Sequence, residues 1–145
     1  MKKEFWFLLI FLTLVMISAF TLILWFTPFG PGISPDSTTY IVAATNLIGG
    51  KGFTLDGSPI THYPPLYPIS LAATSLFGGD ILQTARVFNA LLYGLNLGII
   101  ALAVFLWAGR NYLTTSFAVI FYLASKPLFE LHSYAWSEPL FITLS

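Results

Sequence analysis

The chain has 145 residues, of which 57% are hydrophobic and only 8% are charged. Soluble domains carry about 25% charged residues, so this composition predicts a chain that is solvated mainly by lipid. Six basic residues balance six acidic ones, which argues against a nucleic-acid partner held by a basic patch, and the absence of cysteine excludes disulfide frameworks and thiolate metal sites.

The first long apolar segment covers residues 5–26 and contains no charged residue. At about 1.5 Å per residue, a helix of this length reaches about 33 Å, which is enough to cross a hydrocarbon core of about 30 Å. A cleaved signal peptide is the alternative, because Lys2 and Lys3 supply a positively charged start. However, the run exceeds the roughly 7–15 residues of a signal-peptide core, and no small-residue cleavage site follows it. We therefore expect a retained transmembrane helix with a cytoplasmic N-terminus, since positive residues favour that side.

A long connection that contains many prolines and glycines follows at residues 27–80, and we expect it to form the first outer loop. Within it, apolar residues recur at helical spacing over residues 35–48. This pattern predicts an amphipathic helix suited to the membrane interface. Ser34 suits the N-cap of this helix, and Pro35 suits its first position.

The next segments predict a hairpin turn, a short helix and a long helix, in that order. Asp56–Gly57 predicts the tight turn of a small hairpin. Residues 66–77 predict a helix too short to cross a bilayer, which is either interfacial or a lead-in to the next helix. Residues 81–108 are long enough to cross, and Asp80 with Gln83 resembles a capping box at their start.

The last part of the chain predicts an apolar helix at residues 112–126 and the start of another at residues 138–145. Because the sequence stops within that last apolar segment, we expect it to be the N-terminal part of a longer protein and to be inactive as an isolated piece. The predicted fold class is all-α, with several membrane-spanning helices in the plasma membrane and interfacial helices in the first outer loop. Under this topology five of the six acidic residues lie outside, and an acidic outer face indicates a function there.

Asp36 is the acidic residue whose position is most informative. It falls in the first turn of the predicted helix at residues 35–48, where the helix dipole stabilises a carboxylate by about 0.3–1 kcal/mol and no other role is required. It is also predicted to lie at the membrane surface, beside an apolar wall that excludes water. A carboxylate in that position is suited to act as a general base.

Three other groups of side chains each have a structural and a functional interpretation. The three prolines in residues 61–68 form either a stiff linker or a support that aims His62 or Tyr63 at a ligand. A single histidine is a weak metal signal, although it could also bind a phosphate. Arg86 either reaches lipid headgroups or grips a lipid phosphate. Glu138 either caps a helix or marks a site at the level of the membrane.

A series of residues and short motifs occurs in the order Asp36, Tyr40, GGKGF, HYPPLYP, LFGGD, ARVFN and SEPLF. Together they resemble the N-terminal part of the GT-C membrane glycosyltransferases. The likeness is strongest to the branch that holds the protein O-mannosyltransferases and the aminoarabinose transferases that modify lipid A. It covers nearly the whole chain from residue 5 onward.

The resemblance implies an enzyme with its active site on the outer face, which passes a sugar from a polyprenyl-phosphate carrier to an acceptor with inversion. It implies that Asp36 is the catalytic base or orients the acceptor. The residues that it implies around the donor are Tyr40, His62, Tyr63, Pro64, Pro65, Arg86 and Glu138. Some relatives carry an acid or a lysine just before the paired prolines, where this chain has His62 and Tyr63. Metal use and the substrate are therefore left open, with His62 and Glu138 as candidate ligands of a divalent metal.

Two other functions are kept beside the enzyme. In a transporter or channel module, Asp36, Arg86 and Glu138 would line a substrate path, and helices would be broken near the bilayer midplane. In a non-catalytic membrane scaffold, the acidic residues would only cap helices. The proline and glycine clusters in the outer loop favour the enzyme.

Overall fold

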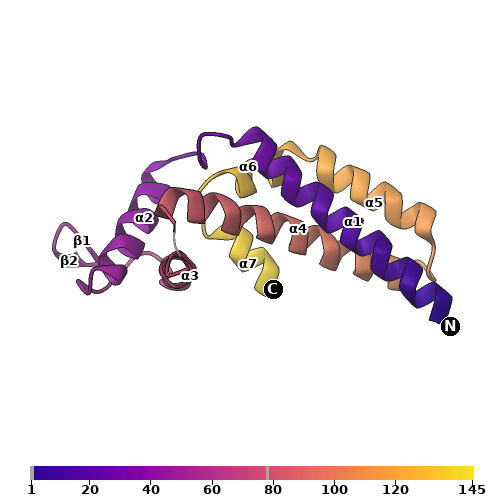
Figure 1. Cartoon of the computed structure of the whole chain (residues 1–145), viewed down its shortest axis with the longest axis horizontal. Helices are drawn as coiled ribbons and strands as arrows, with labels where there is room; N and C mark the ends of the chain where they lie inside the picture. Colours follow the sequence, from indigo (N-terminus) through magenta and orange to yellow (C-terminus); the bar gives the residue numbers. More distant parts are fainter. Residues whose placement is uncertain (1, 78) are drawn as a thin grey trace.

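The computed structural model describes residues 2–77 and 79–145, and this part of the chain is mostly helical. The elements in chain order are α1 (Lys2–Phe26), α2 (Pro35–Ile48), β1 (Thr54–Leu55), β2 (Ser58–Pro59), α3 (Leu66–Ser75), α4 (Ile81–Trp107), α5 (Tyr112–Ala124), α6 (Lys126–Ser133) and α7 (Glu138–Leu144). Figure 1 shows α1, α4 and α5 running along the long axis of the molecule, with α2, α3 and the β1–β2 hairpin gathered at the end away from the N-terminus.

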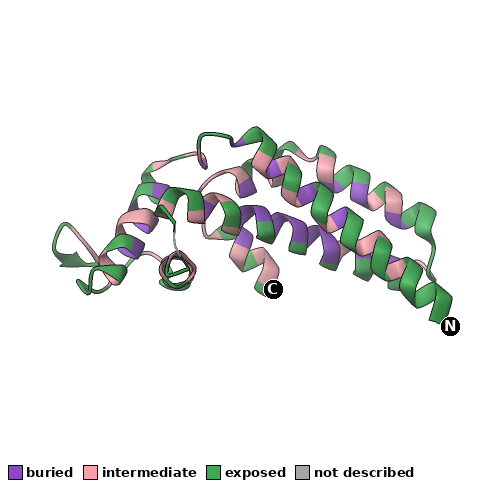
Figure 2. Cartoon of the chain, viewed as in Figure 1, coloured by how far each residue is buried: buried purple, intermediate pink, exposed green. Residues whose placement is uncertain are grey.

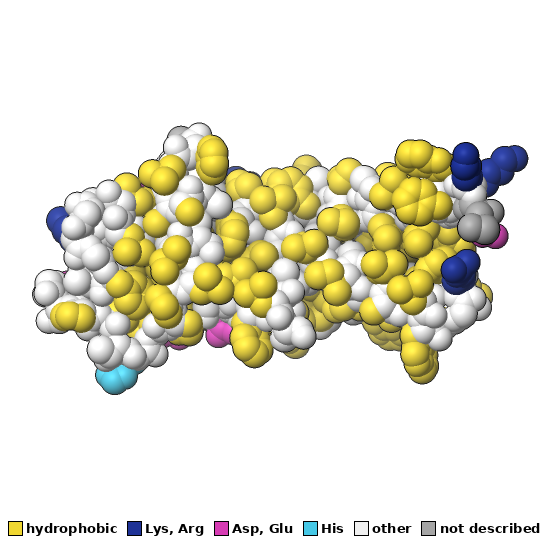
Figure 3. Space-filling view, turned by 90° about the horizontal axis from the view of Figure 1, so that it is seen from below, with side chains coloured by type: hydrophobic (Ala, Val, Ile, Leu, Met, Phe, Trp, Pro, Cys, Tyr) yellow, Lys and Arg dark blue, Asp and Glu magenta, His cyan; other side chains and the backbone are white. Residues whose placement is uncertain are grey.

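Two helices, α1 with 25 residues and α4 with 27, are long and apolar enough to cross a membrane. The apolar side chains of α1 are mostly exposed, and half of the most apolar window of α4 is buried inside the molecule. Figure 2 shows exposed residues along the outer side of α1, and Figure 3 shows hydrophobic side chains covering the middle of the molecule. A soluble domain rarely exposes so large a contiguous apolar surface, so these faces require a non-aqueous environment or a partner.

The packing of α1 against α4 is the most extensive contact between elements. Small residues allow the two helices to approach closely. A Cβ atom built on Gly94 would lie only 2.7 Å from the backbone oxygen of Met16, so only glycine fits at this point of the contact. Around it the main core is made by buried residues of three helices, namely Val15, Ala19, Ile23, Ala90, Tyr93, Leu97, Ala101, Val119 and Tyr122.

A second core joins the loop helices to the outer end of α4. Its buried members are Tyr40, Ala44, Tyr67, Leu71, Ala85 and Ala135. The predicted N-cap residues of α2 and α4 are confirmed, whereas the side chain of Gln83, the second member of the expected capping box, accepts a hydrogen bond from Arg86. Ser34 caps α2 by accepting a hydrogen bond from the backbone N–H of Ser37 at 3.2 Å. Asp80 caps α4 by accepting from the backbone N–H groups of Leu82 and Gln83.

The predicted hairpin is also present. β1 and β2 pair antiparallel, and Asp56 and Gly57 both have positive φ, at 49° and 80°. This combination is typical of the type I′ turn, which matches the twist of a two-residue hairpin.

The helix expected from residue 5 begins at Lys2, the ends expected at residues 108 and 145 lie one residue earlier, and two other predicted helices end two residues too late. The helix expected at residues 66–77 ends at Ser75, and the one expected at residues 112–126 ends at Ala124 and is followed by a separate helix, α6. Pro127 explains where α5 ends. It has no N–H to donate to the carbonyl four residues earlier, but it is tolerated in the first turn of a new helix, which is where it lies.

Candidate functional site

Asp36 lies in the first turn of α2, and its side chain is exposed. The hydroxyl of Tyr63 donates a hydrogen bond to Oδ1 of Asp36 at 2.8 Å. This bond joins the start of α2 to the segment before α3, across 27 residues of sequence. One carboxylate oxygen is therefore oriented by a phenol, while the side chain as a whole is open to solvent.

Two further tyrosines, Tyr40 and Tyr67, pack beneath the Tyr63 ring of this pair. The ring of Tyr40 meets the ring of Tyr63 edge-on, with centroids 5.4 Å apart, and meets the ring of Tyr67 edge-on at 5.3 Å. Tyr67 is fully buried in the first turn of α3. Pro64 and Pro65 connect Tyr63 to α3, with Pro65 at the N-cap position. The paired prolines therefore restrict the short path between the buried Tyr67 and the partly buried Tyr63.

The segment just before α7, with Trp136 and Ser137, also contacts the site, although it is about 100 residues from α2 in the sequence. The hydroxyls of Tyr40 and Ser137 are hydrogen-bonded at 2.9 Å, and the indole N–H of Trp136 donates to Oγ of Ser34 at 2.7 Å. Both bonds fix this segment to the first turns of α2. Glu138 follows directly and is exposed.

A pocket of about 230 Å³ opens between the start of α3 and α7. Its lining is mainly apolar, with the carboxylate of Glu138 as the one charged group, and consists of Pro64, Leu66, Tyr67, Ser137, Glu138, Leu140, Phe141 and Leu144. The structure thus brings five of the predicted residues together, because Asp36, Tyr40 and Tyr63 contact one another while Pro64 and Glu138 line the adjoining pocket.

Nearby acidic groups and burial both raise the pKa values of the Tyr40 and Tyr63 hydroxyls. The hydrogen bond to Asp36 is the main cause that raises the pKa of Tyr63 above its ordinary value. Burial raises the pKa of Tyr40, and the negative charges of Glu138 and Asp36 add to the effect. Both hydroxyls therefore stay protonated at neutral pH and remain able to donate hydrogen bonds.

Arg86 makes a different set of contacts. Its guanidinium donates to the backbone oxygen of Leu24 at 2.7 Å, to Oγ1 of Thr27 at 3.3 Å and to Oε1 of Gln83 at 3.1 Å. Leu24 and Thr27 lie at the C-terminal end of α1, where a cation is favoured by the helix dipole. Arg86 therefore fastens α4 to the end of α1, and its predicted role in donor binding stays a prediction.

His62 is exposed in the loop before α3. Within residues 2–77 and 79–145, no three side chains of His, Cys, Asp or Glu are gathered closely enough to hold a metal ion. His62 and Glu138, the candidate metal ligands, therefore belong to no such group in the described structure.

A buried polar network on α4 was missed by the sequence analysis. The side-chain amide of Asn96 donates to Nε2 of His132 at 3.0 Å and to the backbone oxygen of Pro139 at 3.1 Å. Nδ1 of His132 lies 2.7 Å from the backbone oxygen of Leu128, so the proton must be on Nδ1, and Nε2 accepts. This network ties α6 and the start of α7 to α4.

Asn89 lies seven residues before Asn96 in α4 and also ties distant segments to this helix. Its Oδ1 accepts a hydrogen bond from the hydroxyl of Tyr67 at 3.1 Å, and its amide donates to the backbone oxygen of Tyr134. The only sequence signal for these residues was that two asparagines interrupt an otherwise apolar helix. Their partners could not be inferred, because they come from segments that are distant in sequence.

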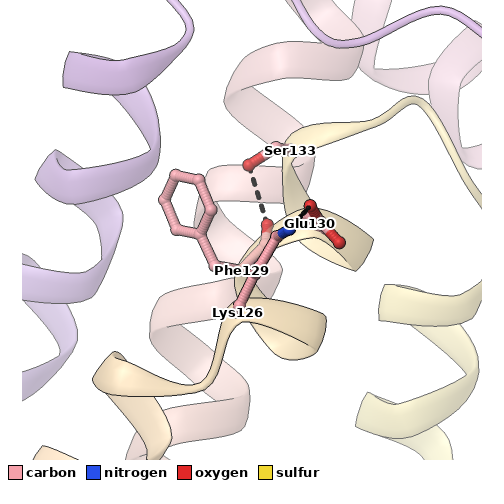
Figure 4. A network of polar contacts seen from close by, with 4 residues as sticks. All are labelled: Lys126, Phe129, Glu130 and Ser133. Atoms are coloured by element: carbon pink, nitrogen blue, oxygen red, sulfur yellow. Dashed lines mark hydrogen bonds and ion pairs between the residues drawn. The ribbon is translucent and has the colours of Figure 1, made fainter.

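A charged pair on α6 lies outside the site. Nζ of Lys126 is 3.4 Å from Oε1 of Glu130, and both side chains are largely exposed. Figure 4 shows this pair beside Phe129 and Ser133, whose hydroxyl donates to the backbone oxygen of Phe129. Exposed pairs of this spacing contribute about 0.3–0.5 kcal/mol, so the pair adds little to the attachment of α6.

Comparisons of the chain with protein-family models, with curated proteins and with solved structures give no match. The function must therefore be argued from the residues themselves.

Proposed function

We propose that the chain forms part of a membrane glycosyltransferase that transfers a sugar from a polyprenyl-phosphate donor to an acceptor on the outer face. One observation carries the proposal. Asp36 presents an open carboxylate that is oriented by the Tyr63 hydroxyl, next to a mainly apolar pocket with Glu138 at its side. Transfer from a lipid-linked sugar needs both features, because the lipid tail requires an apolar surface and the acceptor that attacks the sugar requires a base to take its proton.

The reaction follows from these groups. Asp36 takes the proton of an acceptor hydroxyl or amide, and the deprotonated atom attacks the anomeric carbon from the side opposite the phosphate. The bond between this carbon and the phosphate oxygen breaks, the lipid phosphate leaves with the electron pair, and the configuration is inverted. A phosphate leaves readily when its charge is stabilised, so a base is more necessary here than a strong acid.

The proposed placement in the membrane has α1 and α4 crossing the bilayer in opposite directions. Lys2, Lys3 and Arg110 would then lie on the cytoplasmic side, in agreement with the tendency of positive residues to remain there. The site would lie in the outer interface, where a polyprenyl phosphate exposes its head. The amphipathic helix α2 and the short helix α3 would rest on the membrane surface.

A transporter module is the second candidate, and the break between α5 and α6 favours it. Tyr122 in the last turn of α5 packs against Tyr93, with ring centroids 5.2 Å apart, and Tyr93 lies near the middle of α4. A helix interrupted at this depth is typical of transporters. The enzyme is preferred because Asp36 and Glu138 belong to one site at one end of the bundle, while Asn96 and His132 in the middle of the bundle are buried and hydrogen-bonded to each other.

The deciding experiment measures sugar transfer from polyprenyl-phosphate donors by the full-length protein and by Asp36→Asn. Loss of a general base lowers the rate by about 10²–10⁴-fold. Asp56→Asn is the matched control, since it removes an exposed carboxylate from the hairpin turn of the same loop and asparagine tolerates the positive φ found there. Equal turnover in wild type and Asp36→Asn would remove Asp36 as the base. Solute flux through proteoliposomes without any transfer would favour the transporter.

A further inference from the structure

The end of the molecule opposite to the candidate site carries a concentration of positive charge. Lys2, Lys3 and Arg110 are all exposed there, with Glu4 as the one described acidic side chain beside them. Figure 3 shows Lys and Arg side chains gathered at the end that holds the N-terminus. Three cations against one carboxylate make this end attractive to an anion.

A pocket of about 310 Å³ lies at the same end, between the start of α1, the end of α4 and the start of α5. Its walls are the apolar side chains of Phe5, Leu8, Phe105 and Leu106, and its polar rim consists of Glu4, Arg110 and Tyr112. A purely electrostatic attraction would need no such walls. The combination of an apolar slot and a guanidinium fits a molecule with a chain and an anionic head.

The rim of this pocket is held in place by packing. The ring of Tyr112 contacts the ring of Phe105, with centroids 4.8 Å apart, and meets the ring of Phe11 edge-on at 5.6 Å. The backbone N–H of Arg110 donates to the backbone oxygen of Phe105 at 2.8 Å. Arg110 has a φ of 66°, a conformation that glycine or asparagine adopts more easily, so the turn alone does not explain an arginine here.

We propose that this pocket binds an anionic phospholipid, with an acyl chain in the apolar slot and the headgroup phosphate on Arg110. A guanidinium is suited to this role because it can hold two phosphate oxygens at once. Lys2 and Lys3 add to the attraction from the same end. The ligand reaches the pocket from the bilayer, because Phe5, Trp6 and Trp107 beside it are exposed apolar side chains. The inference depends on the proposed membrane placement and not on the proposed transfer reaction.

The test incubates the purified full chain in nanodiscs of phosphatidylglycerol or phosphatidylcholine and measures the lipids retained by native mass spectrometry. We expect phosphatidylglycerol to be retained preferentially. Arg110→Asn should lower this retention about fivefold or more, since each cation near an anionic surface contributes on that order. Asparagine suits the positive φ, so the variant should unfold at the wild-type temperature. Lys51→Asn, which removes an exposed cation from the other end, should retain lipid like the wild type.

Two further experiments distinguish lipid binding in the pocket from electrostatic attraction to the charged surface. Leu8→Trp fills the slot and keeps every cation, so it should also lower phosphatidylglycerol retention. Soluble glycerol phosphate should not compete, because it has no chain for the slot. Equal retention of the two lipids, unchanged retention in Leu8→Trp, or competition by glycerol phosphate would each overturn the proposal. The readout contains no transfer step, so its failure is distinct from a failure of Asp36 as a base.

Discussion

The hydrogen bond between Tyr63 and Asp36 can be tested through the phenol, without any assumption about catalysis. In the wild type this bond is the first cause of the raised pKa of Tyr63. Asp36→Asn removes the negative acceptor, so we expect the pKa of Tyr63 to fall towards its ordinary value of about 10. The measurement is a tyrosinate absorbance titration, with the curve of Tyr63→Phe subtracted to isolate this residue.

The sign of the pH dependence follows from the same shift. Because the pKa of Tyr63 is raised in the folded state, its contribution to stability is complete below a pH of about 10 and is lost as the pH rises through the raised pKa. Asp56→Asn removes the carboxylate of the hairpin turn and keeps the one that is bonded to Tyr63, so it should leave the titration as it is in the wild type. Identical curves for wild type and Asp36→Asn would mean that this hydrogen bond does not persist in solution.

Arg86 offers a second test at the residue scale, because its structural and functional roles predict different results. Arg86→Met keeps the apolar stem but removes three hydrogen bonds to the end of α1 and to Gln83. Hydrogen bonds that involve a charged group contribute about 1.5–3 kcal/mol each, but this side chain is only half buried, so we expect a total loss of about 1–3 kcal/mol. The measurement is thermal unfolding in detergent, with Lys51→Met as the control for charge.

The opposite result for Arg86 would restore the donor-binding prediction. An unchanged unfolding temperature together with a loss of affinity for a polyprenyl-phosphate donor would show that the guanidinium acts on the phosphate. Arg86→Lys helps here, because it keeps the charge while it cannot reproduce the fork of donors that reaches both Leu24 and Thr27.

At the scale of elements, the contact between α1 and α4 can be tested with two glycines on one face. A Cβ atom at Gly94 would meet the backbone of Met16, whereas one at Gly98 would meet only the flexible side chain of Met16 at 2.8 Å. Gly94→Ala should therefore cost about 1–3 kcal/mol, as overpacking does, while Gly98→Ala should cost less because a thioether can move aside. Thermal unfolding of the two variants gives the comparison directly. Equal costs would mean that the backbone contact at Gly94 relaxes as readily as the side chain of Met16 does at Gly98.

Much of the element structure followed from local signals in the sequence. Ser34 before Pro35, Asp80 before an apolar run and Asp56–Gly57 between short strands each act over a few residues, and all three are confirmed. Helix α6 was missed because the predicted helix was extended to residue 126, just before Pro127, although proline suits the first turn of a new helix. The end of α5 follows from the same proline, whereas the exact end of α3 was predicted less well.

The candidate site was predictable in its members but not in its contacts. Asp36 was selected as the first acidic residue of an amphipathic helix, and this criterion needs only its neighbours in sequence. The bonds from Tyr63 to Asp36 and from Ser137 to Tyr40 join residues 27 and 97 positions apart, and no local pattern specifies such pairs. The roles of Asn96 and His132 were missed for the same physical reason, since a polar residue in an apolar helix shows that a partner is needed but not which one.

At the scale of the whole molecule, the charged groups are separated along its length. Arg110 and the lysines of α1 lie at one end, while Asp36, Asp56 and Glu138 belong to the segments at the other. This separation suits two helices that cross a bilayer in opposite directions, with charge at both surfaces and apolar side chains between. Both proposals depend on it.

The separation predicts which positions can be labelled from which side, and the absence of cysteine makes the test simple. Ser58→Cys lies in the exposed hairpin, and Leu113→Cys lies in the exposed first turn of α5 next to Arg110. In intact cells a membrane-impermeant maleimide should react with Ser58→Cys, whereas Leu113→Cys should react only after permeabilisation. Labelling of both positions from the same side would mean that α4 does not cross the bilayer. Labelling of Leu113→Cys alone would place Asp36 in the cytosol, where the outer-face reaction proposed for it could not occur.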